Sequence, residues 1–482
     1  MYKYCHLLGH RFVNEVQTMA QVFFAREKVN LVEADAFATT GTGVEVVTWV
    51  ADAAHAAVYQ DGVEVAAHAV ALAAPDIVEA DLPPRRVLML AMFHALQAVF
   101  PTVTPWGALT GIRPSKMVRS WLDAGKTDAQ IVTALTQTLR VRADKAQLAL
   151  DVAKAEIRLT ARIHAAVSSQ PVGIYLGIPF CPSRCVYCSF NKAHRPPTRD
   201  ALARYVDTLL HECAEKLIEV REKNAVVTSI YIGGGTPTVL PDDLLAKLLD
   251  AVGTAFSPAR GCEYTVEAGR PDTLTPANLR ILRQAGVNRL AVNPQTLNDH
   301  TLAAIGRKHT AADFFRGFSQ ARAAGFDCIN ADLIAHLPGE GADDLMRNIE
   351  KLGALSPENI TVHTLSVKRA SPLHDAPHTA ANPEDATTPA ALRLAEMGYA
   401  PYYLYRQKNT VGLAENIGFA RPGRECLYNI GMMSEVQTVL GIGAGAVTKY
   451  VDGARITRRF NEKNPEIYVE RRNSHASTQR HP

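Results

Sequence analysis

The sequence predicts an α/β protein: a partial (β/α)6 TIM-type barrel with an N-terminal α+β domain and a C-terminal extension. Three observations lead to this prediction. The 482 residues exceed what one ordinary hydrophobic core accommodates. Six short β-branched runs alternate with helical stretches in the middle of the chain, and a Pro/Ala/Thr-rich segment follows them. We place the domain boundaries at 1–165, 166–375 and 376–482.

The N-terminal region carries strand patterns at 44–50 and 54–59, and a Gln-Asp-Gly turn precedes a third strand pattern at 63–72. A helical run over 85–100 follows two prolines, and helical patterns dominate 115–167. This mixture predicts an α+β domain, to which the sequence assigns no role.

From residue 171 onward, strand and helix patterns alternate. Between the first two strands, residues 199–220 place apolar side chains at i, i+3/i+4 and i+7, which predicts one helical face packed on a sheet. Parallel neighbours need a crossover connection, so six strand–helix units in series predict a parallel sheet, and six rather than eight predict a barrel with an open side. The predicted strands cover 172–178, 227–232, 263–266, 287–292, 329–335 and 359–365.

Beyond the barrel, residues 371–389 have the composition of a linker, and 390–450 form a further compact element rich in Tyr, Gly and Asn. The polar, basic residues 459–482 are expected to be frayed.

Composition excludes several function classes. A net charge of +3 with no dense Lys/Arg block argues against nucleic acid as a partner. The most apolar stretch, 87–100, is shorter than the ~20 residues of a membrane span, so no membrane association is expected. The first 24 residues contain no continuous apolar run, and we therefore expect a cytoplasmic protein without a cleaved signal.

Three of the eight cysteines, Cys181, Cys185 and Cys188, fall within eight residues directly after the first barrel strand. Three thiolates on one loop can ligate three irons of a [4Fe–4S] cubane and leave the fourth iron open. Loops after barrel strands build active sites, so the placement fits catalysis. Zinc is the alternative, but zinc would need a fourth protein ligand, and no second Cys pair follows.

Polar residues follow the other barrel strands. Gly233-Gly234-Gly235-Thr236-Pro237 comes at the end of the second strand, where glycines let consecutive N–H groups form an anion-binding concavity. Polar residues then follow the third and fourth strands or lie on the fifth, and we expect all of them to point at one mouth of the barrel. These residues are Glu267, Gln295, Arg307 and Asp332.

The CxxxCxxC spacing, with Tyr187 before the last cysteine, resembles the radical S-adenosylmethionine (SAM) superfamily. The resemblance implies that the open iron chelates the amino and carboxylate groups of SAM. Reductive cleavage then gives methionine and a 5′-deoxyadenosyl radical, which abstracts a hydrogen atom from the substrate.

Longer phrases narrow the resemblance. Tyr-Leu-Gly-Ile-Pro-Phe-Cys, Tyr-Ile-Gly-Gly-Gly-Thr-Pro-Thr and His-Leu-Pro-Gly are similar to the oxygen-independent coproporphyrinogen III oxidase (dehydrogenase) family. Segments around 109–114, 405–409, 426–430 and 443–446 are similar to its HemZ-type branch. The cofactor-contacting set that this resemblance implies is Tyr175, Tyr187, Gly234, Gly235, Thr236, Glu267, Gln295, Arg307 and Asp332.

The function that the resemblance implies is oxidative decarboxylation of two propionates of coproporphyrinogen III to vinyls, in porphyrin and haem biosynthesis. It also implies a small electron-transfer partner such as flavodoxin or ferredoxin. Carboxylate substrates need cationic or donor groups. The candidates in this sequence are Arg307, Lys308, His309, Lys368, Arg369 and Arg406.

The sequence departs from the decarboxylating members at one position. Those members carry a further cysteine two residues past the third, where this chain has Phe190, and the haem-chaperone branch also has Phe there. Haem binding, with His309, His336 or His363 as axial ligands, therefore stays open. So do other radical reactions on a tetrapyrrole, and an RNA-modifying enzyme is a more distant alternative. Cys426 could supply the missing thiol, although an isolated cysteine is usually a small buried hydrophobe.

Overall fold

The computed structural model describes residues 2–24, 27–167, 169–188, 198–256, 261–367, 371–375, 385–407, 410, 414–453 and 455–478. The chain forms two compact units. The first contains Met1–Ala153 and Leu404–Glu415, and the second contains Lys154–Tyr403 and Asn416–Pro482. The structure thus divides the chain differently from the predicted boundaries, because residues 404–415 join the N-terminal unit.

A buried ion pair ties this segment to the first unit. Lys145 Nζ lies 2.6 Å from Glu415 Oε1, and Trp106 Nε1 donates to Glu415 Oε2 at 2.8 Å. The Arg406 backbone N–H donates to the Ile112 carbonyl at 2.7 Å. The Gly/Pro-rich loop over 105–114 is therefore hydrogen-bonded to residues 406 and 415, which lie about 300 positions later in the sequence.

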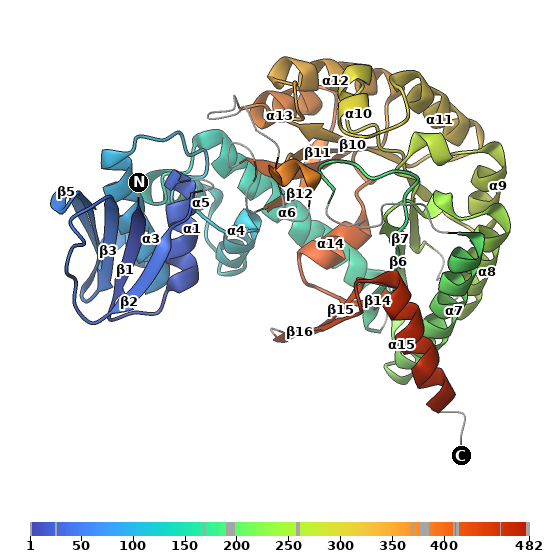
Figure 1. Cartoon of the computed structure of the whole chain (residues 1–482), viewed down its shortest axis with the longest axis horizontal. Helices are drawn as coiled ribbons and strands as arrows, with labels where there is room; N and C mark the ends of the chain where they lie inside the picture. The colour runs from blue at the N-terminus through green and yellow to red at the C-terminus, as the bar shows by residue number, and fades with distance from the viewer. Residues whose placement is uncertain are drawn as a thin grey trace. The chain divides into compact units, whose positions relative to one another are not determined.

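The first unit contains a five-stranded sheet in the order β2-β1-β3-β4-β5, with α1 and α3 packed on it (Figure 1). The three strands and the helix predicted in this region are confirmed. β1, α1 and β2 are additional. β1 lies between β2 and β3 and is largely buried, so it lacks the alternation by which a strand is recognised. The elements are β1 (Lys3–Leu8), α1 (Val13–Phe24), β2 (Asn30–Ala34), β3 (Val44–Val50), β4 (Ala53–Gln60), β5 (Val63–Ala71), α2 (Pro75–Glu79), α3 (Pro84–Val99), α4 (Pro114–Asp123), α5 (Asp128–Thr133), the π-helical turn η1 (Ala134–Thr138) and α6 (Ala143–Ala165).

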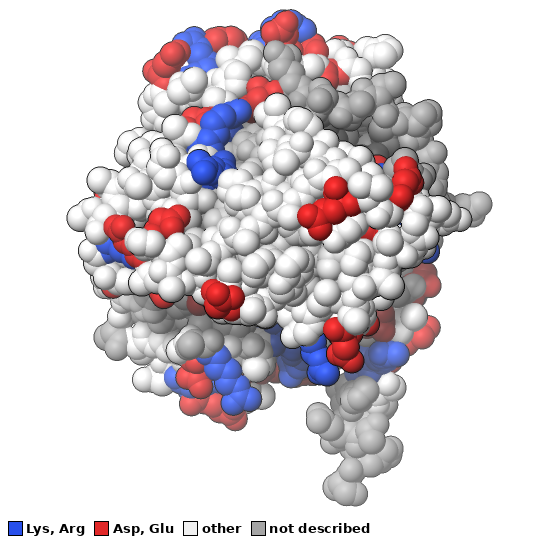
Figure 2. All heavy atoms as spheres, turned by 90° about the vertical axis from the view of Figure 1, so that its left-hand side faces the viewer, with Lys and Arg blue, Asp and Glu red and all other residues white. Residues whose placement is uncertain are grey.

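β5 is an exposed edge strand, with Val63 and Val65 open to solvent. Figure 2 faces the side of the molecule on which this unit is drawn and shows a broad area without Lys, Arg, Asp or Glu. The few charged groups around that area are of both signs.

The second unit contains six parallel strands, β6 to β11, hydrogen-bonded in chain order. This arrangement confirms the predicted partial barrel. Helices α8, α9, α11 and α12 lie outside the strands (Figure 1). The elements are β6 (Pro171–Ile178), α7 (Arg199–Glu222), β7 (Val226–Gly234), η2 (Pro237–Val239), α8 (Asp242–Phe256), β8 (Glu263–Glu267), η3 (Pro271–Thr273), α9 (Pro276–Gln284), β9 (Arg289–Ala291), α10 (Asp299–Ala304), α11 (Ala311–Ala323), β10 (Ile329–Ala335), α12 (Ala342–Leu355) and β11 (Asn359–Thr364).

Local sequence sets where the barrel helices begin. Thr275 and Thr310 form reciprocal capping boxes with the residue three positions on, and Asn298 and Thr198 also accept N-terminal backbone N–H groups. These caps end the loops that follow the strands, so the loops hold their residues at one mouth of the barrel.

The C-terminal elements extend the barrel sheet rather than forming a separate body. β13 pairs antiparallel with β11, and β14 pairs parallel with β6. The predicted linker is too long, because α13 begins inside it; residues 376–384 of that linker lie outside the described residues. The elements are η4 (Pro372–Asp375), α13 (Thr387–Glu396), β12 (Ala400–Arg406), β13 (Glu415–Ala420), α14 (Leu427–Met433), β14 (Thr438–Ile442), β15 (Val447–Asp452), β16 (Arg455–Phe460) and α15 (Pro465–Thr478).

The expectation of a frayed C-terminus is wrong for residues up to 478, because α15 docks on α7. Tyr468 is buried, its hydroxyl donates to Glu212 Oε2 at 2.5 Å, and Arg472 pairs with the same carboxylate. Arg472, one of the basic residues of the tail, therefore forms an ion pair with the buried carboxylate of Glu212. In the part of the chain that the structure describes, we find no helix with the length and apolar character of a membrane span.

Candidate active site

The loop after β6 holds Cys181, Cys185 and Cys188 close together, with Cys185 buried and the other two half-buried. The Val186 N–H donates to the Ile305 carbonyl at 3.1 Å, and the Cys188 N–H donates to the Cys185 carbonyl at 3.1 Å. Thr236 Oγ1 lies 3.4 Å from Cys181 Sγ. The loop is thus attached both to the glycine run after β7 and to the segment after α10.

Arg270 buttresses the cysteine loop, and the sequence reasoning missed it. Its Nη1 donates to Ser183 Oγ at 2.9 Å and lies 4.0 Å from Cys185 Sγ, while Asp272 holds the guanidinium at 3.1 Å through two contacts. Gly306 packs so closely on this loop that an added Cβ would lie 2.8 Å from the Arg184 carbonyl oxygen. The sequence signal that could have identified this residue is its position, directly after the third barrel strand and two residues before Asp272.

The glycine run packs against the start of the cysteine loop. The N–H groups of Gly235 and Thr236 donate to the carbonyls of Ile178 and Phe180 at 2.8 and 2.7 Å. A Cβ on Gly235 would lie 2.5 Å from the Phe180 carbonyl oxygen, and Gly234 has a φ of +106°. Only glycine fits this close approach and this backbone conformation. The predicted anion-binding concavity is wrong for Gly235 and Thr236, because their N–H groups already donate to backbone carbonyls.

Glu267 lies beside the same run. Tyr231 donates its hydroxyl to Glu267 Oε1 at 2.5 Å, and the Gly234 N–H donates to Oε2 at 3.1 Å. Burial, with the nearby charge of Asp332, raises the pKa of Glu267 from 4.5 to about 7. The rings of Tyr175 and Tyr428 stack on Tyr231. Tyr231 and Tyr428 are further residues that sequence reasoning did not select.

Asp332 accepts amide hydrogens from Asn293 and Asn330, each at 2.7 Å, and lies 3.8 Å from His363 Nε2. Burial alone would raise the pKa of Asp332, but His363 and the surrounding hydrogen-bond donors lower it. The carboxylate is therefore held in its ionised form at the mouth of the barrel.

Gln295 has a strained backbone, with a φ of +68°. Its N–H donates to the Asp332 carbonyl at 2.9 Å, and its carbonyl accepts from the Ile334 N–H at 2.9 Å, which fixes the loop to β10. Its side-chain Oε1 is buried without a hydrogen-bond partner among the described residues. Such an orphaned acceptor fits a ligand with a hydrogen-bond donor.

The buried Arg307 guanidinium joins the loops after β8 and β9, since it donates to the Asn293 and Gly269 carbonyls at 2.6 and 3.1 Å. Tyr187 and Cys185 also interact with it, and together they raise its pKa despite burial. Its Nε has no hydrogen-bond partner in the described part of the chain. A buried guanidinium of this kind suits an anionic group of a ligand.

The predicted residues thus converge, and their chemistry fits a cubane cluster with a polar cofactor. Three thiols stand on one loop, a glycine cradle faces them, and Gln295 and Arg307 offer unpartnered polar atoms. Among the described residues, no three His, Cys, Asp or Glu side chains are grouped to hold a single metal ion. A cubane takes one thiolate on each of three irons, whereas a structural zinc site needs a fourth protein ligand, so three cysteines on one loop suit a cluster.

The barrel interior contains a cavity of about 150 Å³. Glu267, Asp332 and His363 line it, and Cys426 lies on its wall. Cys426 is 4% exposed, but its Sγ lies 3.1 Å from Glu263 Oε1, so this cysteine is more than an apolar filler. The remaining lining residues are Tyr231, Thr265, Arg289, Ala291, Asn330, Thr361, Tyr402, Tyr403 and Asn429.

The candidate substrate cations that the structure describes lie in different surroundings. Arg307 is buried between loops, Lys308 is exposed, and Arg406 belongs to the N-terminal unit. The side chain of His309 is fully buried, and burial and Arg307 lower its pKa to about 4. His336 is half-buried at the end of β10, and His363 lies in the cavity. Lys368, Arg369 and Phe190 lie outside the described residues.

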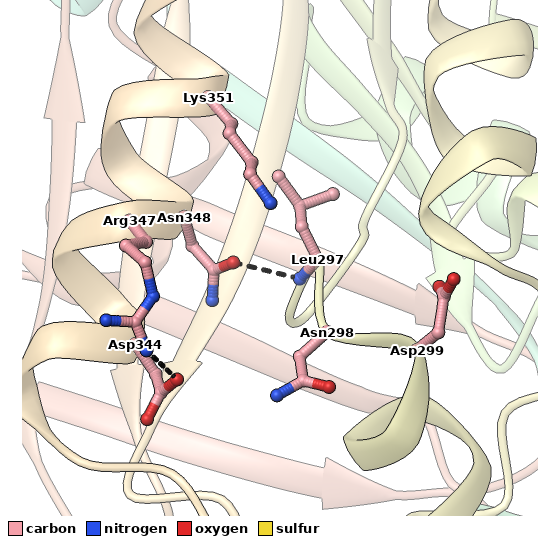
Figure 3. A pocket seen from close by; sticks show the side chains of 7 residues that line it. All are labelled: Leu297, Asn298, Asp299, Asp344, Arg347, Asn348 and Lys351. Atoms are coloured by element: carbon pink, nitrogen blue, oxygen red, sulfur yellow. Dashed lines mark hydrogen bonds and ion pairs between the residues drawn. The ribbon is translucent and has the colours of Figure 1, made fainter.

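A further pocket of about 310 Å³ lies between the start of α10 and the side of α12 (Figure 3). Asn348 Oδ1 accepts the Leu297 N–H at 3.1 Å across it, and Arg347 pairs with Asp344 of its own helix. None of the predicted site residues lines it, so we separate it from the candidate active site.

Comparison with known proteins decides the family. Residues 175–352 match the model of the radical SAM superfamily, and the chain is 36% identical over 407 residues to the oxygen-independent coproporphyrinogen-III oxidase-like protein HemZ of Bacillus subtilis. The match covers 82% of this chain and 81% of that protein. The chain belongs to the radical SAM superfamily, in its HemZ-type branch.

Other relatives of this radical SAM protein cover less of it. The haem chaperone HemW of Bacillus subtilis is 34% identical over 58% of this chain and 71% of its own length. The solved structure of Escherichia coli coproporphyrinogen III oxidase (HemN), described as a radical SAM enzyme, has a TM-score of 0.51. That match has 21% identity and covers 67% of this chain and 72% of HemN, which supports the predicted fold. Superfamily membership also establishes the predicted cofactors, a [4Fe–4S] cluster and SAM.

The raised pKa of Glu267 predicts a pH effect on stability. The proton on Glu267 favours the folded state, so its contribution is complete below about pH 4.5 and is lost as the pH rises through about 7. We expect Glu267→Gln to gain stability relative to the wild type over this range, by on the order of 2 kcal/mol. Denaturant unfolding of both proteins without SAM, from pH 4.5 to 8, measures the difference. Parallel pH curves would contradict the assignment.

Proposed function

We propose that the chain is a coproporphyrinogen III dehydrogenase-like radical SAM enzyme that oxidatively decarboxylates propionate side chains to vinyls in porphyrin and haem biosynthesis. The observation that carries the proposal is the extent of the HemZ match. It covers 82% of this chain, whereas the Bacillus subtilis HemW match covers 58%.

In this proposal Cys181, Cys185 and Cys188 hold the cluster. When bound, the cluster and SAM would supply a carbon radical able to take a hydrogen atom from the propionate β-carbon. Gly234, Gly235 and Thr236 let the backbone lie close to the methionyl end of SAM, and Arg307 supplies a cation. The other SAM-binding residues in the proposal are Tyr175, Tyr187, Glu267, Gln295 and Asp332.

The protein's own groups then orient and shield the reaction. The Glu267 carboxyl is fixed by Tyr231 and the Gly234 N–H, and Asp332 is fixed by two asparagine amides. Such prearranged polar groups need no reorganisation during the reaction. The substrate radical would then lose CO2 and one electron to give the vinyl group, and a one-electron acceptor protein would take that electron. A flavodoxin or ferredoxin in the cytoplasm is the proposed source of the electron that reduces the cluster.

The burial of His309 removes one of the three candidate axial ligands from the haem-chaperone alternative, because a haem iron would have to reach a fully buried ring. An anaerobic assay with reconstituted protein, dithionite, SAM and coproporphyrinogen III distinguishes the functions. We expect a product that has lost two CO2 units, seen by mass spectrometry. An absence of CO2 loss combined with a stoichiometric haem spectrum would overturn the proposal in favour of haem delivery.

A further inference from the structure

Polar side chains line the barrel cavity both near its mouth and one layer deeper. Residues two apart on a strand face the same side, so the cavity residues form two layers. Glu267, Asp332 and His363 make the layer nearest the mouth, and Thr265, Asn330 and Thr361 lie one layer deeper. Barrel interiors are ordinarily filled by branched apolar side chains. A polar deep layer therefore indicates a ligand.

Most polar groups of the deep layer satisfy one another. Thr361 Oγ1 lies 3.3 Å from Asn330 Oδ1, and the Tyr403 hydroxyl donates to Thr361 Oγ1 at 3.4 Å. On the wall formed by α14, Asn429 Nδ2 lies 3.4 Å from the Tyr402 hydroxyl. These contacts form a hydrogen-bonded network in two parts on the cavity wall.

Two neighbouring donors remain outside that network. Thr265 on β8 is 2% exposed and Arg289 on β9 is buried, yet Thr265 Oγ1 and Arg289 Nε have no hydrogen-bond partner among the described residues. The two residues are register partners on adjacent parallel strands, and both line the cavity. Buried donors without acceptors are rare in native proteins. Their pairing here indicates a ligand with acceptor oxygens.

Hydrogen bonds from the other two guanidinium nitrogens fix the position of the Arg289 side chain, and with it the position of Nε. Its other nitrogens donate to Asn359 and to the Arg424 and Glu425 carbonyls, at 2.8 and 2.9 Å for the two carbonyls. Glu263 Oε2 lies 3.3 Å from Nε as an ion-pair partner but accepts no hydrogen bond from it. A guanidinium beside a hydroxyl suits a carboxylate.

We propose that Thr265 and Arg289 form a carboxylate subsite, which receives the propionate arm that reacts; the proposal rests on the decarboxylating function above. Cavities of about 150 Å³ hold a benzene-sized molecule, so a propionate arm fits the volume. With the carboxylate in the deep layer, the β-carbon lies two bonds nearer the mouth, between Thr265 and the layer of Glu267 and Asp332. The site thereby selects which carbon faces the cofactor groups.

The matched variants are Thr265→Val, Thr265→Ser and Ser229→Ala. Thr265→Val keeps the shape of the side chain and removes an unpartnered hydroxyl, so it should fold normally. Ser229 on β7 also carries a buried hydroxyl without a partner in the described chain, but it does not line the cavity. It controls for the loss of a buried hydroxyl elsewhere in the barrel.

The probe is sodium [1-13C]propionate, titrated by NMR line broadening into cluster-loaded protein with SAM and without reductant. We expect saturable binding to the wild type and to Ser229→Ala, and near wild-type binding to Thr265→Ser. Thr265→Val should bind about tenfold more weakly, as expected for one lost hydrogen bond to a charged group. Equal binding to wild type and Thr265→Val, or no saturable binding to the wild type, overturns the subsite.

The decarboxylation assay tests the proposed function independently of the propionate-binding experiment, which tests the subsite. If propionate binding depends on Thr265 while coproporphyrinogen loses no CO2, the subsite stands for a different carboxylate substrate and the proposed function falls. If CO2 is lost while binding is indifferent to Thr265, the proposed function stands and the subsite falls.

Discussion

A Cys185→Ser variant will fold but will lose the iron–sulfur cluster, and its formation of 5′-deoxyadenosine will fall by at least about 1000-fold. Cys185 is the most buried of the three loop cysteines and lies 4.0 Å from Arg270 Nη1. A hydroxyl is a poor replacement for a thiolate ligand to iron. Iron content, the cluster absorbance and 5′-deoxyadenosine after dithionite reduction are the three measurements.

The control for this variant is Cys5→Ala. Cys5 is also buried, but it lies on β1 in the N-terminal unit and outside the candidate site. Its substitution should leave the cluster and the cofactor cleavage intact. A Cys185→Ser protein that keeps a full cluster and normal 5′-deoxyadenosine formation would refute the ligand assignment.

Glu415→Gln will destabilise the N-terminal unit by about 3–5 kcal/mol, because it leaves a buried ammonium without its carboxylate. The side chains of Lys145 and Glu415 are 3% and 0% exposed, and they lie 2.6 Å apart. The three tryptophans of the chain, Trp49, Trp106 and Trp121, all belong to this unit. Their fluorescence during denaturant unfolding therefore reports the stability of this unit specifically.

Replacing both partners by apolar residues is the matched control. A Lys145→Met, Glu415→Leu double variant should recover part of the stability that the single variant loses, since the buried ammonium is removed together with its carboxylate. If Glu415→Gln unfolds within about 1 kcal/mol of the wild type, the pair does not anchor residues 404–415 to this unit.

The barrel was predictable because its strands are short β-branched runs with helices between them, and all six parallel strands lie where the pattern indicates. β1 was missed because its burial between β2 and β3 leaves no alternation to recognise. α15 was misjudged because its basic residues are typical of a frayed tail. Their role becomes visible only with Glu212, which lies more than 250 residues earlier and accepts Tyr468 and Arg472.

The candidate site also contains residues that could be predicted from the sequence and residues that could not. The cysteines, the glycine run and the residues at strand ends could be selected from sequence, because spacing and position after a strand identify them. Arg270 supports the cysteine loop from the loop after β8, and the pair of Thr265 with Arg289 depends on the register between β8 and β9. Such contacts arise from tertiary packing, and no local pattern encodes them.

The measurement that tests the central claim most directly follows a labelled hydrogen. Coproporphyrinogen III deuterated at the propionate β-carbons is incubated anaerobically with the reconstituted protein, SAM and reductant. The account predicts that deuterium appears in 5′-deoxyadenosine, together with vinyl product and CO2. Unlabelled 5′-deoxyadenosine, with the four propionates intact, would contradict it.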